Sequence, residues 1–254
     1  MAFIDDLGLI EALLLLGGVL LTYVGLVGWY RMYKNDAKGL RQALTGASVP
    51  LGGVGIAATI IGLWGEMVWN YQPWTALGGY NIFFTDVVLL FGLVLVALAA
   101  SMYKELSLQY VGLFALVAGG ITLFYGWTGY GYSYTKEPFE TLLLYAGFGV
   151  SGIMAFPATV LVDHYLANGA TSKMFWTTAA PSRSARGLTG AVRAAQSISP
   201  STTEEKNGDL RYRLPIYVSF LLLAFPVFMA LAALAAYFYL GSTIPGHLAP
   251  GKTP

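Results

Sequence analysis

Six runs of apolar residues divide this chain, and each is long enough to cross a lipid bilayer. They cover residues 7–29, 49–69, 83–103, 109–129, 140–163 and 214–240. A helix needs about 20 apolar residues to span the hydrocarbon core of a membrane. None of the runs alternates between apolar and polar residues as a strand of a membrane barrel does. The sequence therefore predicts an all-α integral membrane protein with six transmembrane helices.

Composition supports this fold class and excludes several kinds of chemistry. Hydrophobic residues make up 56% of the chain and charged residues 11%, whereas soluble domains carry about 25% charged residues. The absence of cysteine excludes disulfides, thiolate nucleophiles and iron–sulfur clusters. The two histidines, His164 and His247, exclude bis-histidine haem ligation within the bilayer. We expect no cofactor, no metal and no nucleic-acid partner, with the lipid bilayer as the main surroundings.

The basic residues between the apolar runs predict the orientation in the membrane. The connection 30–48 and the segment 165–213 are rich in lysine and arginine, whereas 70–82 and 130–139 contain only Lys136 and Glu137 as charged residues. Loops rich in lysine and arginine face the cytoplasm in most membrane proteins. We therefore expect a multi-pass protein of the cell membrane with its basic loops cytoplasmic and both termini outside. The first run follows acidic residues rather than basic ones, so we interpret it as a retained helix and not as a signal peptide.

These boundaries suggest four parts. A five-helix membrane bundle is expected over 1–164, and a basic, partly disordered cytoplasmic loop over 165–213. The sixth transmembrane helix is expected over 214–240, and an extracytoplasmic tail over 241–254. Pro157 and Pro226 lie inside predicted helices, where proline removes a backbone hydrogen bond and favours a kink.

One hairpin unit occurs twice. The first copy, LWGEMVWNYQPWTALGGYNIFFTDVVLLFG, covers 63–92, and the second, LFYGWTGYGYSYTKEPFETLLLYAGFG, covers 123–149. Both join two apolar helices through an aromatic-rich loop with a proline, and both have the same orientation. Helices two–three and four–five would then form a parallel internal repeat related by an axis along the membrane normal. The alternative is that membrane hairpins share such features without a common origin.

Three pairs of small residues four positions apart predict close helix packing: Gly53 with Ala57, Ala115 with Gly119, and Gly147 with Ser151. Small residues at this spacing let two helix backbones approach. Such faces serve contacts within one bundle or contacts with another membrane protein. Partner subunits and self-association are therefore both compatible with the sequence.

Acidic residues within the predicted spans are the first candidates for a polar site. Glu11, Glu66, Asp86 and Glu140 all lie near the outer ends of their helices. Glu66 and Asp86 flank the first aromatic loop with Asn81 between them, so these three residues form the candidate polar site at the outer face. Such a site could share a proton or bind a cation. The alternative for Asp86 and Glu140 is capping of a first helical turn, which the helix dipole favours; Glu66, in a last turn, opposes the dipole.

Aromatic side chains gather at the same predicted depth. The candidate aromatic cap consists of Trp64, Trp69, Trp74, Tyr80, Trp127 and Tyr130. One interpretation is a cap over a pocket for an apolar or quinone-like ring. The other is an ordinary interfacial belt of tryptophan and tyrosine with packing between loops.

The sequence contains none of the common catalytic motifs. The chain has no glycine-rich phosphate loop, no nucleophile elbow and no spacing of carboxylates and histidines typical of a metal site. Asp163 and His164 are adjacent near a helix end, where a polar interface cap is more common than a set of ligands. We name no catalytic residue and lean against an enzyme.

The string YQPWTALGGYNIFFTD followed by LLFG resembles an uncharacterised family of prokaryotic multi-pass membrane proteins, a domain-of-unknown-function family with a duplicated helical hairpin. The resemblance covers about 10–165. It implies an archaeal or bacterial cell membrane and no activity. The matching positions are Trp69, Pro73, Tyr80, Asn81, Ile82, Thr85 and Asp86 in the first copy, and Pro138, Tyr145, Gly147 and Pro157 in the second.

Three functions remain open. The first is a structural or accessory subunit of a membrane assembly, which fits the missing chemical motifs and the small-residue faces. The second is a transporter or channel for protons, cations or a small solute, with Glu66 and Asp86 near an outer vestibule. The third is a quinone-binding membrane protein or membrane enzyme, which lacks metal ligands and nucleophiles.

Overall fold

The fold, seen in a computed structural model, is a bundle of long helices. The structure describes residues 6–69, 78–133, 135, 138–168 and 216–248. Six helices lie within these residues, and each is long and apolar enough to cross a membrane. They are α1 (Asp6–Tyr33), α2 (Ala37–Trp69), α3 (Gly78–Tyr103), α4 (Gln109–Gly131), α5 (Pro138–Asn168) and α6 (Ile216–Leu248). The prediction of an all-helical multi-pass membrane protein is confirmed.

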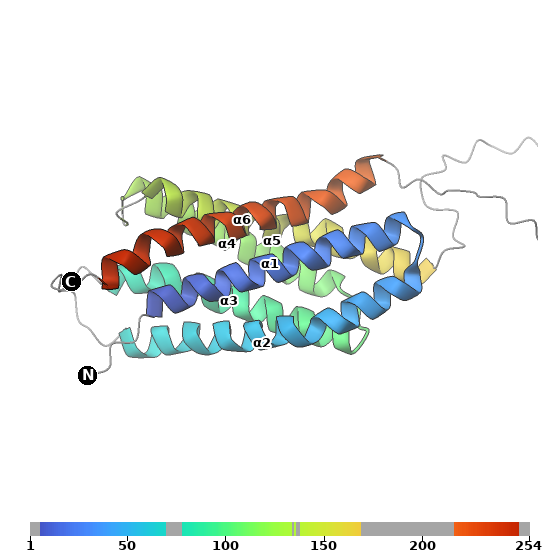
Figure 1. The fold of residues 1–254 in the computed structure, drawn as a ribbon, viewed down its shortest axis with the longest axis horizontal. Coiled ribbons are helices and arrows are strands. Elements are labelled where there is room, and N and C mark those ends of the chain that lie inside the picture. The colour runs from blue at the N-terminus through green and yellow to red at the C-terminus, as the bar shows by residue number, and fades with distance from the viewer. Residues whose placement is uncertain (1–5, 70–77, 134, 136–137, 169–215, 249–254) are drawn as a thin grey trace, which may run out of the picture.

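The helices run along one long axis (Figure 1), and the contacts between them form a closed ring. Each helix packs against the next in the sequence, and α6 packs back against α1. The most extensive contacts join α2 to α3, α4 to α5 and α1 to α6, whereas α3 and α4 touch least among neighbours. We call the end with connections 34–36 and 104–108 the basic end. The opposite end is where α1 begins and α6 ends.

Several helices are longer than their apolar runs. Only residues 34–36 separate α1 from α2, so most of the predicted connection 30–48 is helical. At the opposite end α6 continues to Leu248, eight residues beyond the predicted limit at 240. A helix satisfies its backbone hydrogen bonds internally and can continue through polar residues outside the hydrocarbon core. Hydropathy therefore locates the membrane-embedded part of a helix better than its ends.

The turn between α1 and α2 is closed by side-chain hydrogen bonds. Asn35 adopts a left-handed conformation with φ of 56°, which asparagine tolerates better than most residues. The Asp36 carboxylate accepts a bond of 2.8 Å from the Gly39 backbone nitrogen at the start of α2, as an N-cap does. Its other oxygen forms an ion pair with Arg31 at 2.6 Å. One acid thus ties the end of α1 to the start of α2.

Asp36 is expected to titrate below the usual carboxyl range. The Gly39 backbone N–H, and after it the Arg31 guanidinium, lower the pKa of Asp36. Its contribution to stability is therefore present above the unfolded pKa and is lost as pH falls through the lowered folded pKa. Carboxyl NMR shifts of Asp36 against pH check this. Arg31→Gln should raise that pKa, whereas a pKa unchanged by Arg31→Gln would contradict the assigned pairing.

Glycines bring α2 and α3 into backbone contact. A Cβ atom added at Gly92 of α3 would lie 2.5 Å from the Thr59 nitrogen and 2.9 Å from the Gly55 oxygen of α2. At Gly62 an added Cβ would lie 2.8 Å from the Leu89 Cα. No side chain fits at such distances from backbone atoms. This hairpin is therefore held together by surfaces that require glycine.

The second hairpin, α4 and α5, is also held in backbone contact by glycines. An added Cβ at Gly152 of α5 would lie 2.7 Å from the Ala115 oxygen of α4, and one at Gly119 would lie 2.5 Å from the Gly149 oxygen. On the other side of α5, a Cβ at Gly147 would lie 2.8 Å from Ala232 of α6. The small-residue faces predicted at Ala115–Gly119 and Gly147–Ser151 therefore pack within the bundle. Gly53, by contrast, has open space at its Cβ position.

A shift of 60 residues relates these contacts. The approach of Gly92 to Gly55 and Thr59 in the first hairpin corresponds to that of Gly152 to Ala115 and Gly119 in the second. The shift also relates the contact of Gly52 with Ala99 to that of Gly112 with Thr159. The correspondence covers the middle and the basic-end half of both hairpins, beyond the segments 63–92 and 123–149.

Prolines inside the helices include Pro50 of α2, Pro157 of α5 and Pro226 of α6. Pro226 is fully buried, and a Cβ added at Gly25 of α1 would lie 3.0 Å from the Pro226 Cβ. Pro226 therefore forms part of the α1–α6 packing surface.

Candidate functional site

A layer of hydrogen-bonded polar side chains crosses α2, α3 and α4 near the opposite end. Thr85 donates a hydrogen bond to the Glu66 carboxylate, and the Tyr125 hydroxyl donates to Asp86 at 2.5 Å. The carboxyl groups of Glu66 and Asp86 lie close enough to interact with each other. The structure therefore brings together two of the three residues predicted for the polar site. Asn81 belongs to α3, but its side chain lies outside the described residues.

The position of Asp86 corrects one expectation. Because α3 begins at Gly78 and not near 83, Asp86 lies in the third helical turn and not in the first. A capping role for Asp86 is therefore wrong, and its hydroxyl partner on α4 explains how its charge is accommodated. Glu140 does lie in the first turn of α5, where it is exposed. Glu66 lies in the last turn of α2, as expected.

Tyr145 connects α5 to the same layer. Its ring stacks on Phe83 with ring centroids 4.7 Å apart, and its hydroxyl donates 2.7 Å to the Phe83 backbone oxygen. The Phe83 backbone oxygen has two lone pairs, so it can accept this bond and still accept the backbone hydrogen bond within α3. The tyrosine is buried. Together with Tyr125 it ties α4 and α5 to α3 at the opposite end.

Glu11 of α1 is more deeply placed than the sequence indicated. Its side chain is 1% exposed. It lines a small cavity of about 10 Å³ together with Thr122, Tyr145 and Phe84. Glu11 therefore lies beside the same small cavity as Tyr145, although it comes from the first helix. The sequence could not show these neighbours, because they come from α3, α4 and α5.

The described aromatic residues of the predicted cap lie on the outer surface. Trp64 is 52% exposed, Trp127 71% and Tyr130 45%. Outward-facing aromatics at one end of a membrane bundle are typical of an interfacial belt. Trp69 and Tyr80 lie in α2 and α3, but their side chains are outside the described residues, and Trp74 is outside them altogether. Whether these residues form a cap stays a prediction.

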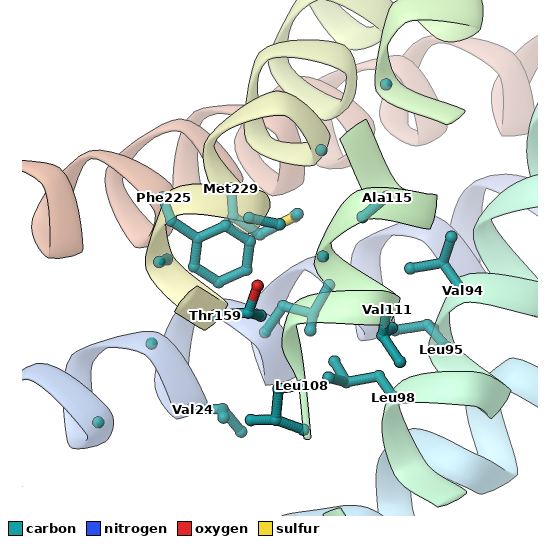
Figure 2. Close-up of a pocket in the computed structure, with 18 of the residues that line it drawn as sticks. Val24, Val94, Leu95, Leu98, Leu108, Val111, Ala115, Thr159, Phe225 and Met229 are labelled. Atoms are coloured by element: carbon teal, nitrogen blue, oxygen red, sulfur yellow. The ribbon is translucent and has the colours of Figure 1, made fainter. Parts of the chain in front are cut away.

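A central cavity lies inside the ring of helices (Figure 2). Its volume is about 140 Å³, and residues from each of the six described helices line it. The lining is almost entirely apolar. Representative residues, one from each helix in order, are Val24, Leu44, Leu98, Val111, Thr159 and Met229. An apolar cavity of this size stays dry and can hold a small hydrocarbon.

The central cavity is long and narrow. Along α4 its lining extends from Leu108 to Thr122, a distance of about 20 Å at the rise of an α-helix. Along α5 it extends over a similar distance, from Phe148 to Val162. A volume of about 140 Å³ over this length makes the cavity narrow. Thr122 and Phe148 also line the small cavity beside Glu11, so the deep end of the central cavity adjoins that small cavity.

At the basic end a larger polar cavity joins the central one. This vestibule has a volume of about 480 Å³ and shares Leu44, Met102 and Leu108 with the central cavity. Its other lining residues include Arg41 and His164. The two spaces therefore lie next to each other, the polar one at the basic end and the apolar one inside the bundle.

Asp163 fixes one wall of the vestibule. Its carboxylate accepts bonds from the backbone nitrogens of Leu108 at 2.9 Å and Gln109 at 2.8 Å, and from the Ser107 hydroxyl at 2.6 Å. The two backbone donors are N–H groups at the start of α4, where a helix offers them no acceptor of its own. The expectation of a polar interface cap at Asp163 is confirmed. Its charge is compensated by the helix terminus, so Asp163 is already fully engaged.

Arg41 forms the other charged wall. One guanidinium nitrogen lies 3.2 Å from the Glu105 carboxylate, and another donates 3.3 Å to the Leu166 backbone oxygen. Both side chains of the ion pair are more than half exposed, and such pairs contribute about 0–1 kcal/mol. Arginine has five N–H donors, so further acceptors can bind without breaking these contacts.

Comparison with known proteins gives one family. The family described as "Protein of unknown function (DUF981)" matches residues 1–180. No curated protein and no solved structure matches the chain. The matched segment contains α1 to α5, and with them the polar layer and most of the lining of both cavities.

Proposed function

Because the chain belongs to the DUF981 family of proteins of unknown function, we propose from its cavities that it is a membrane carrier for a slender apolar solute. The observation that carries the proposal is the apolar central cavity, which is lined by the six described helices and adjoins a polar vestibule at one end. Binding sites between the helices of a membrane bundle have this character. The solute enters through the vestibule and lies along the bundle axis.

The arrangement of the hairpins supports a carrier. We infer a parallel internal repeat of α2–α3 and α4–α5, supported by the constant 60-residue shift between their glycine contacts. In repeat-built transporters the substrate site lies between the repeats, which move against each other as rigid units. Here residues of both hairpins line the central cavity, and α3 and α4 make the lightest contact between neighbours in the ring.

We further propose the orientation and the membrane. Arg31, Lys34, Lys38, Arg41 and Lys104 lie at the basic end, which by the positive-inside rule faces the cytoplasm of a prokaryotic cell membrane. The vestibule then opens to the cytoplasm. The polar layer of Glu66, Asp86 and Tyr125 closes the bundle on the outer side.

A channel for protons or cations is less well supported. A proton or ion reaching the polar layer from the basic end would have to cross about 20 Å of apolar lining. Apolar constrictions exclude water and so block ions. An outer ion site at Glu66 and Asp86 stays a prediction, but their hydrogen bonds to Thr85 and Tyr125 also serve to join three helices.

The other hypotheses also stay predictions. An accessory subunit needs surfaces for partners, and two of the three small-residue pairs that suggested such surfaces are used inside this bundle. Gly53 faces outward and remains available for contact with another helix. A quinone ring is wider than the hydrocarbon chain that the central cavity accommodates.

Filling the central cavity is expected to abolish solute binding. The indole of Trp29 lines the cavity, so an alkyl bromide that enters should quench its fluorescence. With purified protein in a neutral detergent, 1-bromododecane should produce a saturable quenching component that Trp29→Phe removes. Ala115→Phe places a ring in the cavity beside Val111 (Figure 2) and should remove the same component.

The matched control lies two residues along α4. Val117 is exposed on the outer face of the helix, so Val117→Phe should leave the saturable quenching unchanged. The melting temperature of each variant in detergent shows that it is folded, and Ala115→Leu provides a smaller filling where phenylalanine unfolds the bundle. Saturable quenching that is equal in Ala115→Phe, Ala115→Leu and the parent protein would sink the proposed function.

A further inference from the structure

We propose that the solute is a single-chain amphiphile with an anionic head, its chain lying in the central cavity and its head in the vestibule beside Arg41. This inference rests on the proposed function and names the chemical class of its ligand. The head is a carboxylate or a phosphate, since both present acceptor oxygens with negative charge. Neither cavity alone indicates an amphiphile, but an apolar cavity that adjoins one with charged residues does.

The junction defines where the head and the chain lie. Leu44, Met102 and Leu108 line both cavities and form the boundary between the polar mouth and the apolar interior. On one side the lining includes charged and hydroxyl groups, and on the other almost none. An amphiphile at such a boundary buries its chain and keeps its head hydrated, which satisfies both parts.

The shape of the interior selects one chain. A narrow space whose lining extends over about 20 Å suits the shape of one extended hydrocarbon chain, whereas two parallel chains need about twice the width. Each methylene group transferred from water contributes about 0.8 kcal/mol. This contribution applies to a chain taken from water, whereas a chain drawn from a bilayer or a micelle is bound through its packing in the cavity and the contacts of its head.

The charges at the mouth favour an anion. Of the two acids that line the vestibule, Asp163 is engaged by the start of α4 and Glu105 by Arg41. Arg41 uses two nitrogens in its contacts with Glu105 and Leu166, which leaves donors for a carboxylate or phosphate oxygen. Lys38 and Lys104 add positive charge at the same end. Among the described residues that line the vestibule, both acids already have partners, so a cationic head would have to compete for them.

Displacement of bromododecane from the cavity tests this directly. Dodecanoate, dodecyl phosphate and the uncharged dodecanol share one chain and differ in their heads. At a pH well above the carboxyl pKa, the two anions should reverse Trp29 quenching at about tenfold lower concentration than dodecanol, the effect of one charge-assisted hydrogen bond. A preference for one anion over the other identifies the head as carboxylate or phosphate.

Substitutions at the mouth should then separate head from chain. Arg41→Gln should weaken both anions about tenfold and leave dodecanol unchanged, whereas Arg41→Lys should keep most of the preference. Glu105→Gln removes the competing acid and should strengthen the anions about twofold. Lys104 lies at the same end without lining the vestibule, so Lys104→Gln is the matched control with little effect.

Each contrary outcome has a separate meaning. If dodecanol displaces as well as the anions, or if Arg41→Gln weakens all three alike, the anionic head is refuted while the proposed function stands. If none of the three displaces bromododecane that binds saturably, a single-chain amphiphile is refuted. If bromododecane itself shows no saturable quenching, the proposed function fails before the inference is reached.

Discussion

Gly92→Leu is expected to lower the free energy of unfolding by about 3 kcal/mol, the upper part of the range for overpacking a well-packed site. A Cβ atom at this position would lie 2.5 Å from the Thr59 nitrogen of the facing helix. Backbone atoms cannot move aside as the end of a side chain can, so α2 and α3 must separate. The separation also breaks contacts along the rest of the hairpin. Unfolding of the purified protein by increasing mole fractions of dodecyl sulfate measures the loss.

Two further leucine variants give this prediction its controls. Gly152 occupies the corresponding place in the second hairpin, 2.7 Å from the Ala115 oxygen, so Gly152→Leu should cost about as much as Gly92→Leu. Gly53 lies on α2 with open space around it, and Gly53→Leu should change stability by less than about 0.5 kcal/mol. Equal losses at Gly53 and Gly92 would mean that helix packing is not the cause.

Asp163→Ala is expected to cost about 2 kcal/mol or more. Loss of an N-cap side chain costs about 0.5–2 kcal/mol, and here the carboxylate also accepts a third, charge-assisted bond from Ser107. Three donors at the start of α4 would lose their acceptor together. Because the acceptor belongs to α5, the variant also loosens α4 from α5 at the basic end. Hydrogen exchange of the Leu108 and Gln109 amides should accelerate along with the loss of stability.

Asp163→Asn and Glu140→Ala complete this experiment. Asparagine keeps one acceptor oxygen and no charge, so it should recover about half of the loss. Glu140 is another acid in a first helical turn, but it is exposed, and Glu140→Ala should cost about 0.5 kcal/mol or less. A result in which Asp163→Ala and Glu140→Ala are equally mild would show that the cap contributes little.

The sequence predicts the helices of this fold well but not where they end. Runs of about 20 apolar residues report the hydrocarbon core, and the structure has a helix at each of them. The same signal does not report the polar turns beyond the core. That is why α3 was expected to begin near 83 rather than at Gly78, and why Asp86 was given a capping role that its depth excludes.

The sequence identifies the acidic residues of the candidate polar site by their type, but it does not identify their hydrogen-bond partners. A carboxylate within an apolar run is conspicuous in any sequence, so Glu11, Glu66 and Asp86 could be named. The hydroxyl groups that satisfy Glu66 and Asp86 come from Thr85 and Tyr125, and threonine and tyrosine are common in membrane helices. Only the packing of α2, α3 and α4 shows which of them lies opposite each acid.

The central cavity has no signature in the sequence. Its lining residues are ordinary leucines, valines and alanines that would fill a core if the helices lay closer together. The space exists because α3 and α4 touch lightly while each is held tightly to its own hairpin partner. The correspondence between the two hairpins is also difficult to recognise from the sequence alone. Gly55 and Thr59 correspond to Ala115 and Gly119, which share small size but differ in identity.

The closure of the ring by α6 bears on the order in which the protein can assemble during synthesis. Each glycine-packed hairpin is continuous in sequence, so α2–α3 and α4–α5 can form as soon as both of their helices have been made. Helix α6 contacts α1 and α5, and it contributes Leu222, Phe225 and Met229 to the cavity wall. A nascent chain that ends before residue 216 therefore leaves one side of the interior open to lipid. The wall of the central cavity is therefore complete only after α6 has been made.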